Sequence, residues 1–143
     1  MRKTATFLLF SAVFFSTLVV KAEQSAPPSG SLKAVMQGLQ TDMNTLSEAL
    51  FTENYALMEE AALRVAAHPK PSPLVLAKVT KHLGKNVMGF KKYDDTVHDA
   101  AIALTKAAKK KDLPAAQAQY HAVVDGCLAC HTAFRRELVE VLK

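Results

Sequence analysis

Apolar residues recur at helical spacing along most of this chain. In a first stretch, over about residues 31–51, they advance in steps of three and four: Leu32, Val35, Met36, Leu39, Met43, Leu46 and Leu50. The same periodicity predicts helices over about residues 53–67, 74–82, 86–110 and 112–138. No segment shows the strict alternation of a half-buried strand, so the pattern predicts an all-α fold.

Residues that break helices separate these stretches. Three prolines at alternate positions, Pro69, Pro71 and Pro73, cannot continue a helix. Ser31 is suited to cap the first helix and Asp112 the last. Pro114 then falls in the first turn of the last helix, where proline is tolerated. Four long amphipathic helices with mostly short links predict an antiparallel four-helix bundle, whose facing helices can enclose a cofactor.

The N-terminal residues have the pattern of a secretory signal peptide. A short basic region, Met1-Arg2-Lys3, precedes an apolar run over residues 7–20, and Val20-Lys21-Ala22 offers small residues before a cut. A membrane anchor is the alternative, but the run is short for a span of about 20 residues. We therefore expect a cleaved signal peptide over residues 1–22, a flexible leader over 23–30 and one domain over 31–143.

Cleavage changes the interpretation of the charge. It removes Arg2, Lys3 and Lys21 but no acidic residue, so the formal net charge falls from +5 to +2. No basic stripe interleaved with aromatic residues is present, and we expect no nucleic-acid partner. After cleavage we also expect no membrane contact.

The residues that carry chemistry are Cys127-Leu128-Ala129-Cys130-His131, which form C-x-x-C-H, the attachment signal for a c-type haem. On a helix, Cys127, Cys130 and His131 project from one face. The two thiols would form thioethers with the porphyrin, and the imidazole would be the proximal ligand of the iron. The sequence therefore predicts one covalent haem c in the core of the bundle, where the last helix meets the first.

Three other interpretations of the motif are weaker. A redox-active dithiol would be expected in a βαβ context, which this chain lacks. A structural zinc site needs four ligands, and these are the only two cysteines. A structural disulfide would not require the adjacent histidine. Because haem is attached to c-type cytochromes outside the cytoplasmic membrane, the motif and the signal peptide together predict a periplasmic protein.

With Phe134 and Arg135 after the motif, the C-terminal region resembles the class II c-type cytochromes, the cytochrome c-prime group. In that group the motif lies near the C-terminus of a four-helix protein. Residues 35–43 resemble the first helix of the group more loosely. The resemblance implies that Arg135 lies near the haem, either pairing with a propionate or shaping the proximal pocket; a solvated Arg135 is the alternative. Many members carry an arginine on the first helix where this chain has Leu32, with Lys33 beside it.

The resemblance also indicates the residue on the distal side of the iron. High-spin members place an apolar residue there and low-spin members a methionine, and the matching residue here is Met36. A thioether is a soft ligand, and His/Met ligation raises the reduction potential of a haem. Ordinary core packing of Met36, ligation by Met43 and a second histidine ligand remain alternatives. We expect Met58 and Met88 in the core.

A His/Met-ligated haem implies an electron carrier that meets redox partner proteins transiently and is not an enzyme. The chain has no P-loop, nucleophile elbow or zinc-protease motif. The alternative function is binding of nitric oxide or carbon monoxide at an open or displaceable distal position. Class II cytochromes are often dimers through their first two helices, so a homodimer is an alternative to a monomer.

Overall fold

A computed structural model describes residues 26–142 of the chain. The predicted signal peptide and the first residues of the leader lie outside this range. Within it, residues 26–31 form no helix, and nearly everything after them is helical. No strand occurs between residues 26 and 142, which confirms the all-α prediction.

The helices follow the predicted order with two additions. The four helices of the bundle are α1 (Leu32–Phe51), α2 (Tyr55–Ala66), α4 (Val87–Lys109) and α5 (Leu113–Cys130). A further helix, α3 (Pro73–Leu83), lies between α2 and α4 in the chain. A 3₁₀ turn, η1 (Gly84–Asn86), joins α3 to α4. The last predicted helix is divided, because a π-helical segment, η2 (His131–Arg135), separates α5 from α6 (Arg136–Val141).

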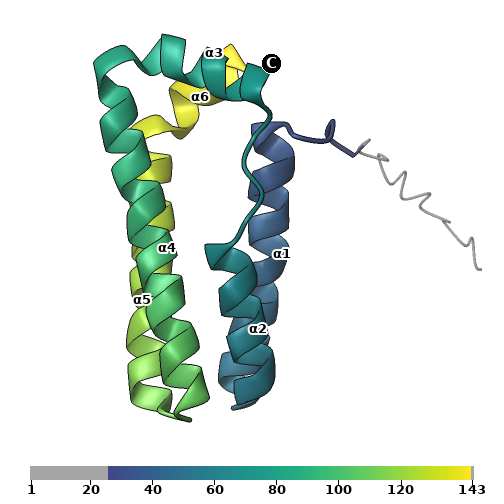
Figure 1. Cartoon of the computed structure of the whole chain (residues 1–143), viewed down its shortest axis with the longest axis vertical. Helices are drawn as coiled ribbons and strands as arrows, with labels where there is room; N and C mark the ends of the chain where they lie inside the picture. The colour runs from purple at the N-terminus through teal and green to yellow at the C-terminus, as the bar shows by residue number, and fades with distance from the viewer. Residues whose placement is uncertain (1–25, 143) are drawn as a thin grey trace, which may run out of the picture.

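Two antiparallel helix pairs, α1 with α2 and α4 with α5, stand side by side, and α3 crosses one end of the bundle near α6 (Figure 1). Packing is extensive between α4 and α5, between α2 and α4 and between α1 and α2. The fourth neighbouring pair, α1 and α5, makes far fewer contacts. The predicted four-helix bundle is confirmed, and its loosest seam is the one at which the sequence suggested a haem.

Side-chain caps explain where the helices begin. Ser31, Asn54, Ser72 and Asp112 each accept a hydrogen bond from the backbone N–H three residues further on. Such caps satisfy donors that the first turn of a helix leaves unpaired. The caps predicted at Ser31 and Asp112 are confirmed.

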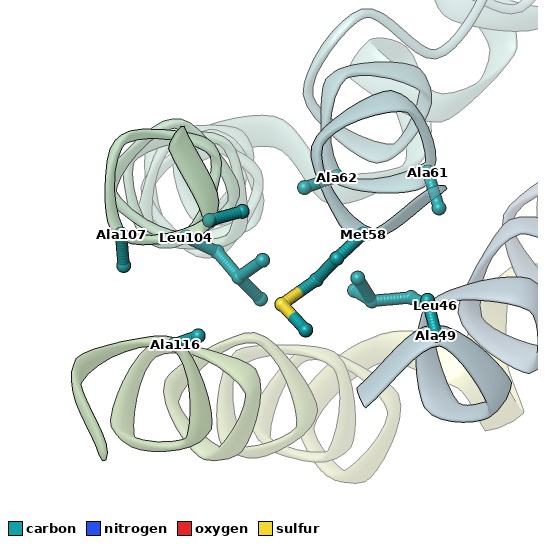
Figure 2. Close-up of a cluster of buried hydrophobic side chains, with 9 residues drawn as sticks. Leu46, Ala49, Met58, Ala61, Ala62, Leu104, Ala107 and Ala116 are labelled. Carbon is teal, nitrogen blue, oxygen red and sulfur yellow. The ribbon is translucent and has the colours of Figure 1, made fainter. Parts of the chain in front are cut away.

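At the end of the bundle that holds the α1–α2 and α4–α5 turns, side chains alone fill the core. All four long helices contribute to this turn-end cluster: Leu46, Ala49, Met58, Ala61, Ala62, Leu104, Ala107, Ala108 and Ala116. Met58 is fully buried and points between Leu46 and Leu104, and the alanines let the helix backbones approach (Figure 2). The expectation for Met58 is confirmed.

Met88 does not lie in the core, because 69% of its surface is exposed. It is the second residue of α4, directly after η1, and its side chain has turned away from the bundle. Helical periodicity over the middle of α4 does not determine which way its first turn faces.

Candidate functional site

The last turn of α5 carries both cysteines into the bundle. Cys127 packs against a middle cluster formed by Val65, Ala66, Val97, Ala100, Ala101 and Val123. Cys130 packs against a motif-end cluster formed by Val79, Leu83, Phe134 and Leu138. Both are half-buried free thiols, so the structure does not contain the structural disulfide considered above.

A close approach of α5 to α4 fixes the position of this turn. Gly126, directly before Cys127, is buried, and a Cβ atom on it would lie 2.8 Å from Cγ2 of Val97. Real Cβ atoms do not come so close to a neighbour. Val97 is itself buried and, as a β-branched residue, has little freedom to turn away. Glycine at position 126 therefore allows the motif to sit tightly on α4.

We expect Gly126→Ala to destabilise the protein by about 1–3 kcal/mol, because the added methyl group overpacks the α4–α5 contact. The free energy of unfolding from a denaturant titration measures this effect. Gly38→Ala is the matched control, since nothing lies within 4 Å of a Cβ atom at Gly38 in α1. Alanine there should leave stability unchanged or raise it by up to about 1 kcal/mol. Equal effects of the two substitutions would contradict the packing argument.

The thiols do not have the electrostatics of a redox-active pair. Burial raises the pKa of Cys127. Burial, and then the neighbouring Cys127 and Asp94, raise the pKa of Cys130 to about 11. Thioredoxin-like dithiols instead have lowered pKa values, because the thiolate is the nucleophile. The surroundings of these cysteines therefore argue against dithiol chemistry.

His131 begins the π-helical segment η2, and its side chain is exposed. It follows Cys130 directly and lies four residues after Cys127, so the motif keeps its three reactive side chains within one turn. The hydroxyl of Thr132 donates to the carbonyl oxygen of Leu128 at 2.8 Å, beside the point where the α-helical pattern ends. π-helical segments inside α-helices frequently occur at functional sites. The sequence analysis did not predict this one.

An aromatic group packs beneath the motif. Phe134, in η2, is buried and meets Phe90 edge-on, with ring centroids 5.7 Å apart and planes at 83°. It meets Tyr93 in the same way at 6.1 Å and 69°. All three rings belong to or contact the motif-end cluster, as Cys130 does. Phe134 therefore anchors η2 to α4, and the contribution of Tyr93 was missed by the sequence analysis.

Across the loose α1–α5 seam, α1 presents an apolar stripe to the motif. Leu32 packs against the motif-end cluster, which also contacts Cys130, and Leu39 packs against the middle cluster, which also contacts Cys127. Met36 lies between them on the same stripe and is 37% exposed, outside every buried cluster. Met43 packs instead against the middle and turn-end clusters, further from the motif.

The comparison with family models agrees with this geometry. The model of the Cytochrome C' family matches residues 33–135, which include most of the four long helices and the whole motif. The chain belongs to the cytochrome c′ family. Searches of curated proteins and of solved structures found no match for this chain.

Membership of the cytochrome c′ family makes this chain a class II c-type cytochrome with covalently bound haem c. The residues present fit that group. Two free, half-buried thiols stand one turn apart, an exposed imidazole follows, and a methionine lies across the loosest seam of the bundle. Cytochromes c′ are typically periplasmic. Between residues 26 and 142, no helix is long and apolar enough to cross a membrane.

Two arginines follow the motif directly. Arg135 ends η2, and both Arg135 and Arg136 are exposed with no ion pair to another described residue. Leu32 packs into the motif-end cluster, while Lys33 beside it is exposed. The apolar residue at position 32 therefore serves the core of this cytochrome c′, and Arg135 and Arg136 are the exposed cations nearest the motif in the sequence.

Three of the four other histidines of this cytochrome c′ have polar partners of their own, and the fourth, His121, is exposed on α5. Nε2 of His68 lies 3.1 Å from Oδ1 of Asp94, and its Nδ1 lies 3.3 Å from the carbonyl oxygen of Pro69. Nδ1 of His98 donates to the carbonyl oxygen of Ala66 at 2.9 Å. His82 lies 3.9 Å from Glu137. These contacts favour a single histidine ligand, His131, over a bis-histidine haem.

The contact between His68 and Asp94 makes stability depend on pH. The hydrogen bond that His68 donates to Asp94 raises the pKa of His68, against the opposing effect of burial, and the same bond lowers the pKa of Asp94. The contribution of His68 is therefore complete below its unfolded pKa of about 6.5 and is lost as pH rises through its folded pKa. That of Asp94 is present above about pH 3.9 and is lost as pH falls through its folded pKa.

We therefore expect His68→Gln to cost the most stability between about pH 4 and pH 6.5, and progressively less above it. The pair is partly solvated, so the largest difference should be about 0.5–1 kcal/mol. Unfolding free energies of wild type and variant between pH 5 and pH 8.5 measure it. Asp94→Asn should likewise cost less stability as the pH rises above about 6.5. A loss of stability that instead grows with rising pH would contradict the predicted effect of this pair.

Proposed function

We propose that this cytochrome c′ is an electron carrier with one haem c. Cys127 and Cys130 hold the porphyrin as thioethers, His131 is the proximal iron ligand and Met36 the distal ligand. The position of Met36 carries the proposal: it lies opposite the motif on α1, between two residues that contact the same clusters as the cysteines. Its soft thioether is partly exposed and engaged in no buried cluster.

The chain supplies what an electron carrier needs. When bound, the haem iron supplies one-electron chemistry. Ligation of the iron by both His131 and Met36 in the two oxidation states would keep rearrangement during electron transfer small. Arg135, exposed beside the motif, is suited to pair with a propionate by charge-assisted hydrogen bonds. No substrate is transformed, so the protein is a carrier and not an enzyme.

We also propose that this protein functions in the periplasm. After signal-peptide cleavage at Ala22, the protein works in the periplasm and meets its redox partner proteins in short-lived complexes. Such transient interfaces are small. A homodimer through α1 and α2 is compatible with this function.

One observation favours a second function. Met36 is not held by a buried cluster, so its side chain has room to swing away and leave the distal position to a gas. Binding of nitric oxide or carbon monoxide would then replace electron transfer.

An optical spectrum of the purified, haem-loaded protein tests the proposal. An electron carrier with His131 and Met36 as ligands should be low-spin in the ferric state, with a weak sulfur-to-iron band near the red end, and should cycle reversibly in voltammetry. A high-spin ferric spectrum, with immediate binding of carbon monoxide by the ferrous protein, would contradict the electron carrier and support the gas-binding function.

A further inference from the structure

The charge of this chain is unevenly distributed. Between Glu60 and Asp94 the sequence holds seven lysines and arginines and not one aspartate or glutamate. Two of these cations are neutralised by neighbours, Arg64 by Asp42 and Glu60, and Lys91 by Asp95. The others, which include every lysine of α3 and η1, form no ion pair with a described residue.

The helix α3 has two distinct faces. Val75, Val79 and Leu83 turn inward to the motif-end cluster. On the opposite side, steps of four and three residues align Leu74, Lys78 and Lys81, and Lys85 follows in η1. These four exposed residues form what we call the α3 face. Leu74 is 70% exposed at one end of this face, and Met88, 69% exposed, follows its other end.

The opposite end of the bundle carries lysines with acidic residues among them. They lie at the end of α4 and in the following turn, where Lys109 pairs with Glu59 at 3.3 Å and Asp112 follows Lys111 directly. Lys106, Lys110 and Lys111 are exposed and form no ion pair with a described residue. The α3 face differs from this end because no aspartate or glutamate accompanies its lysines in the sequence.

We propose that the α3 face is the docking surface for an acidic redox protein, which rests on the electron-carrier function proposed above. The inner side of α3 packs into the same cluster as Cys130. One helix, about 10 Å in diameter, therefore separates the lysines from a thioether position of the haem. A partner held by these lysines, with Leu74 and Met88 as apolar contacts, is brought close to the electron-transfer centre.

The chemistry of the α3 face favours a protein over an anionic membrane. Helices that lie in a membrane interface bury a broad apolar face among the lipids. Most of the apolar face of α3 is already buried inside the bundle, and the large apolar side chains exposed on α3 and at the start of α4 are Leu74, Leu76 and Met88. Unpaired lysines around few apolar side chains instead suit complementary charges on a partner, which steer encounter and speed association.

The test uses a plant-type [2Fe–2S] ferredoxin as an acidic protein probe, reduced at about −400 mV and mixed with the oxidised holoprotein by stopped flow. Lys78→Gln/Lys81→Gln/Lys85→Gln removes the charges of the α3 face and keeps helix propensity. The matched control, Lys106→Gln/Lys110→Gln/Lys111→Gln, removes the same charge at the other end. We expect the second-order rate at low salt to fall about tenfold in the first variant and less than twofold in the control.

A binding map by NMR gives a readout that does not depend on electron transfer. Oxidised ferredoxin added to the ¹⁵N-labelled holoprotein should shift or broaden amide signals of residues 73–88, and high salt should reverse this. Equal rate losses in the two variants, or shifts centred elsewhere, would overturn the docking proposal. So would lysine-dependent binding to anionic phospholipid vesicles at physiological salt without a response to ferredoxin.

The two proposals fail in different ways. If the rate of reduction by ferredoxin does not depend on the three lysines, the electron-carrier function is retained and the docking surface is wrong. Shifts confined to the α3 face, in a protein whose iron accepts no electron from ferredoxin, would overturn the electron-carrier function while supporting an acidic protein at this surface.

Discussion

Met36→Ala is expected to convert the ferric protein from low-spin to high-spin. Alanine offers no ligand atom, so the sulfur-to-iron band should vanish, and the ferrous iron should bind carbon monoxide readily. The reduction potential should fall by a substantial part of the range of about 0.8 V that axial ligands span. Optical spectra in both oxidation states and a redox titration measure these changes. Stability should change little by comparison, because Met36 belongs to no buried cluster.

Met43→Ala provides the control on the same helix. Met43 packs between the middle and turn-end clusters, so its truncation should cost stability, about 2 kcal/mol, and leave the spectrum intact. A Met36→Ala spectrum identical to wild type would exclude Met36 as the ligand. If only Met43→Ala lost the sulfur-to-iron band, the protein would still be an electron carrier, with Met43 as the distal ligand.

Cys127→Ala/Cys130→Ala is expected to abolish covalent haem. The mature wild type should weigh one haem more than its polypeptide and retain that haem through acid–acetone extraction, whereas the double variant should have the mass of the bare chain. A bound haem stabilises only the folded state, so the variant should also unfold at a lower temperature. Mass spectrometry and thermal unfolding, after expression with haem-maturation machinery, test both expectations.

The single variants refine this result. Cys127→Ala should leave at most one thioether, at Cys130. His131→Ala should keep the covalent haem but lose its proximal ligand and its native redox behaviour. A wild-type protein with the mass of the bare chain under the same conditions would contradict haem attachment at this motif.

Most of the fold could be predicted from the sequence, because its signals are local. The 3.6-residue periodicity defines the four long helices, and Ser31 and Asp112 cap helices where the sequence suggested. The division of the last helix was missed, since Phe134 and Leu138 continue the apolar pattern through η2. The exposed position of Met88 was missed as well, because the turn before α4 decides it.

The haem motif could also be recognised from the sequence, because five consecutive residues specify it. The surroundings of the motif depend on contacts between residues distant in sequence. His68 and Asp94 are 26 residues apart, and the ring of Tyr93 meets that of Phe134 across two helices. No periodicity encodes such pairs. The requirement for glycine at position 126 likewise appears only once α4 lies against α5.

The π-helical segment η2 has a consequence for the tolerance of the chain to insertions and deletions. Each residue of an α-helix advances the chain by about 100° around the axis. A π-helical turn, with hydrogen bonds from residue i to i+5, holds one residue more than an α-helical turn. Removal of Thr132 or Ala133 would therefore let this segment return to α-helical bonding while Phe134 and Leu138 keep their places in the core. Removal of a residue inside α5 has no such relief, because it turns every later side chain about the axis. During divergence, a single-residue deletion should therefore be tolerated better within η2 than within α5.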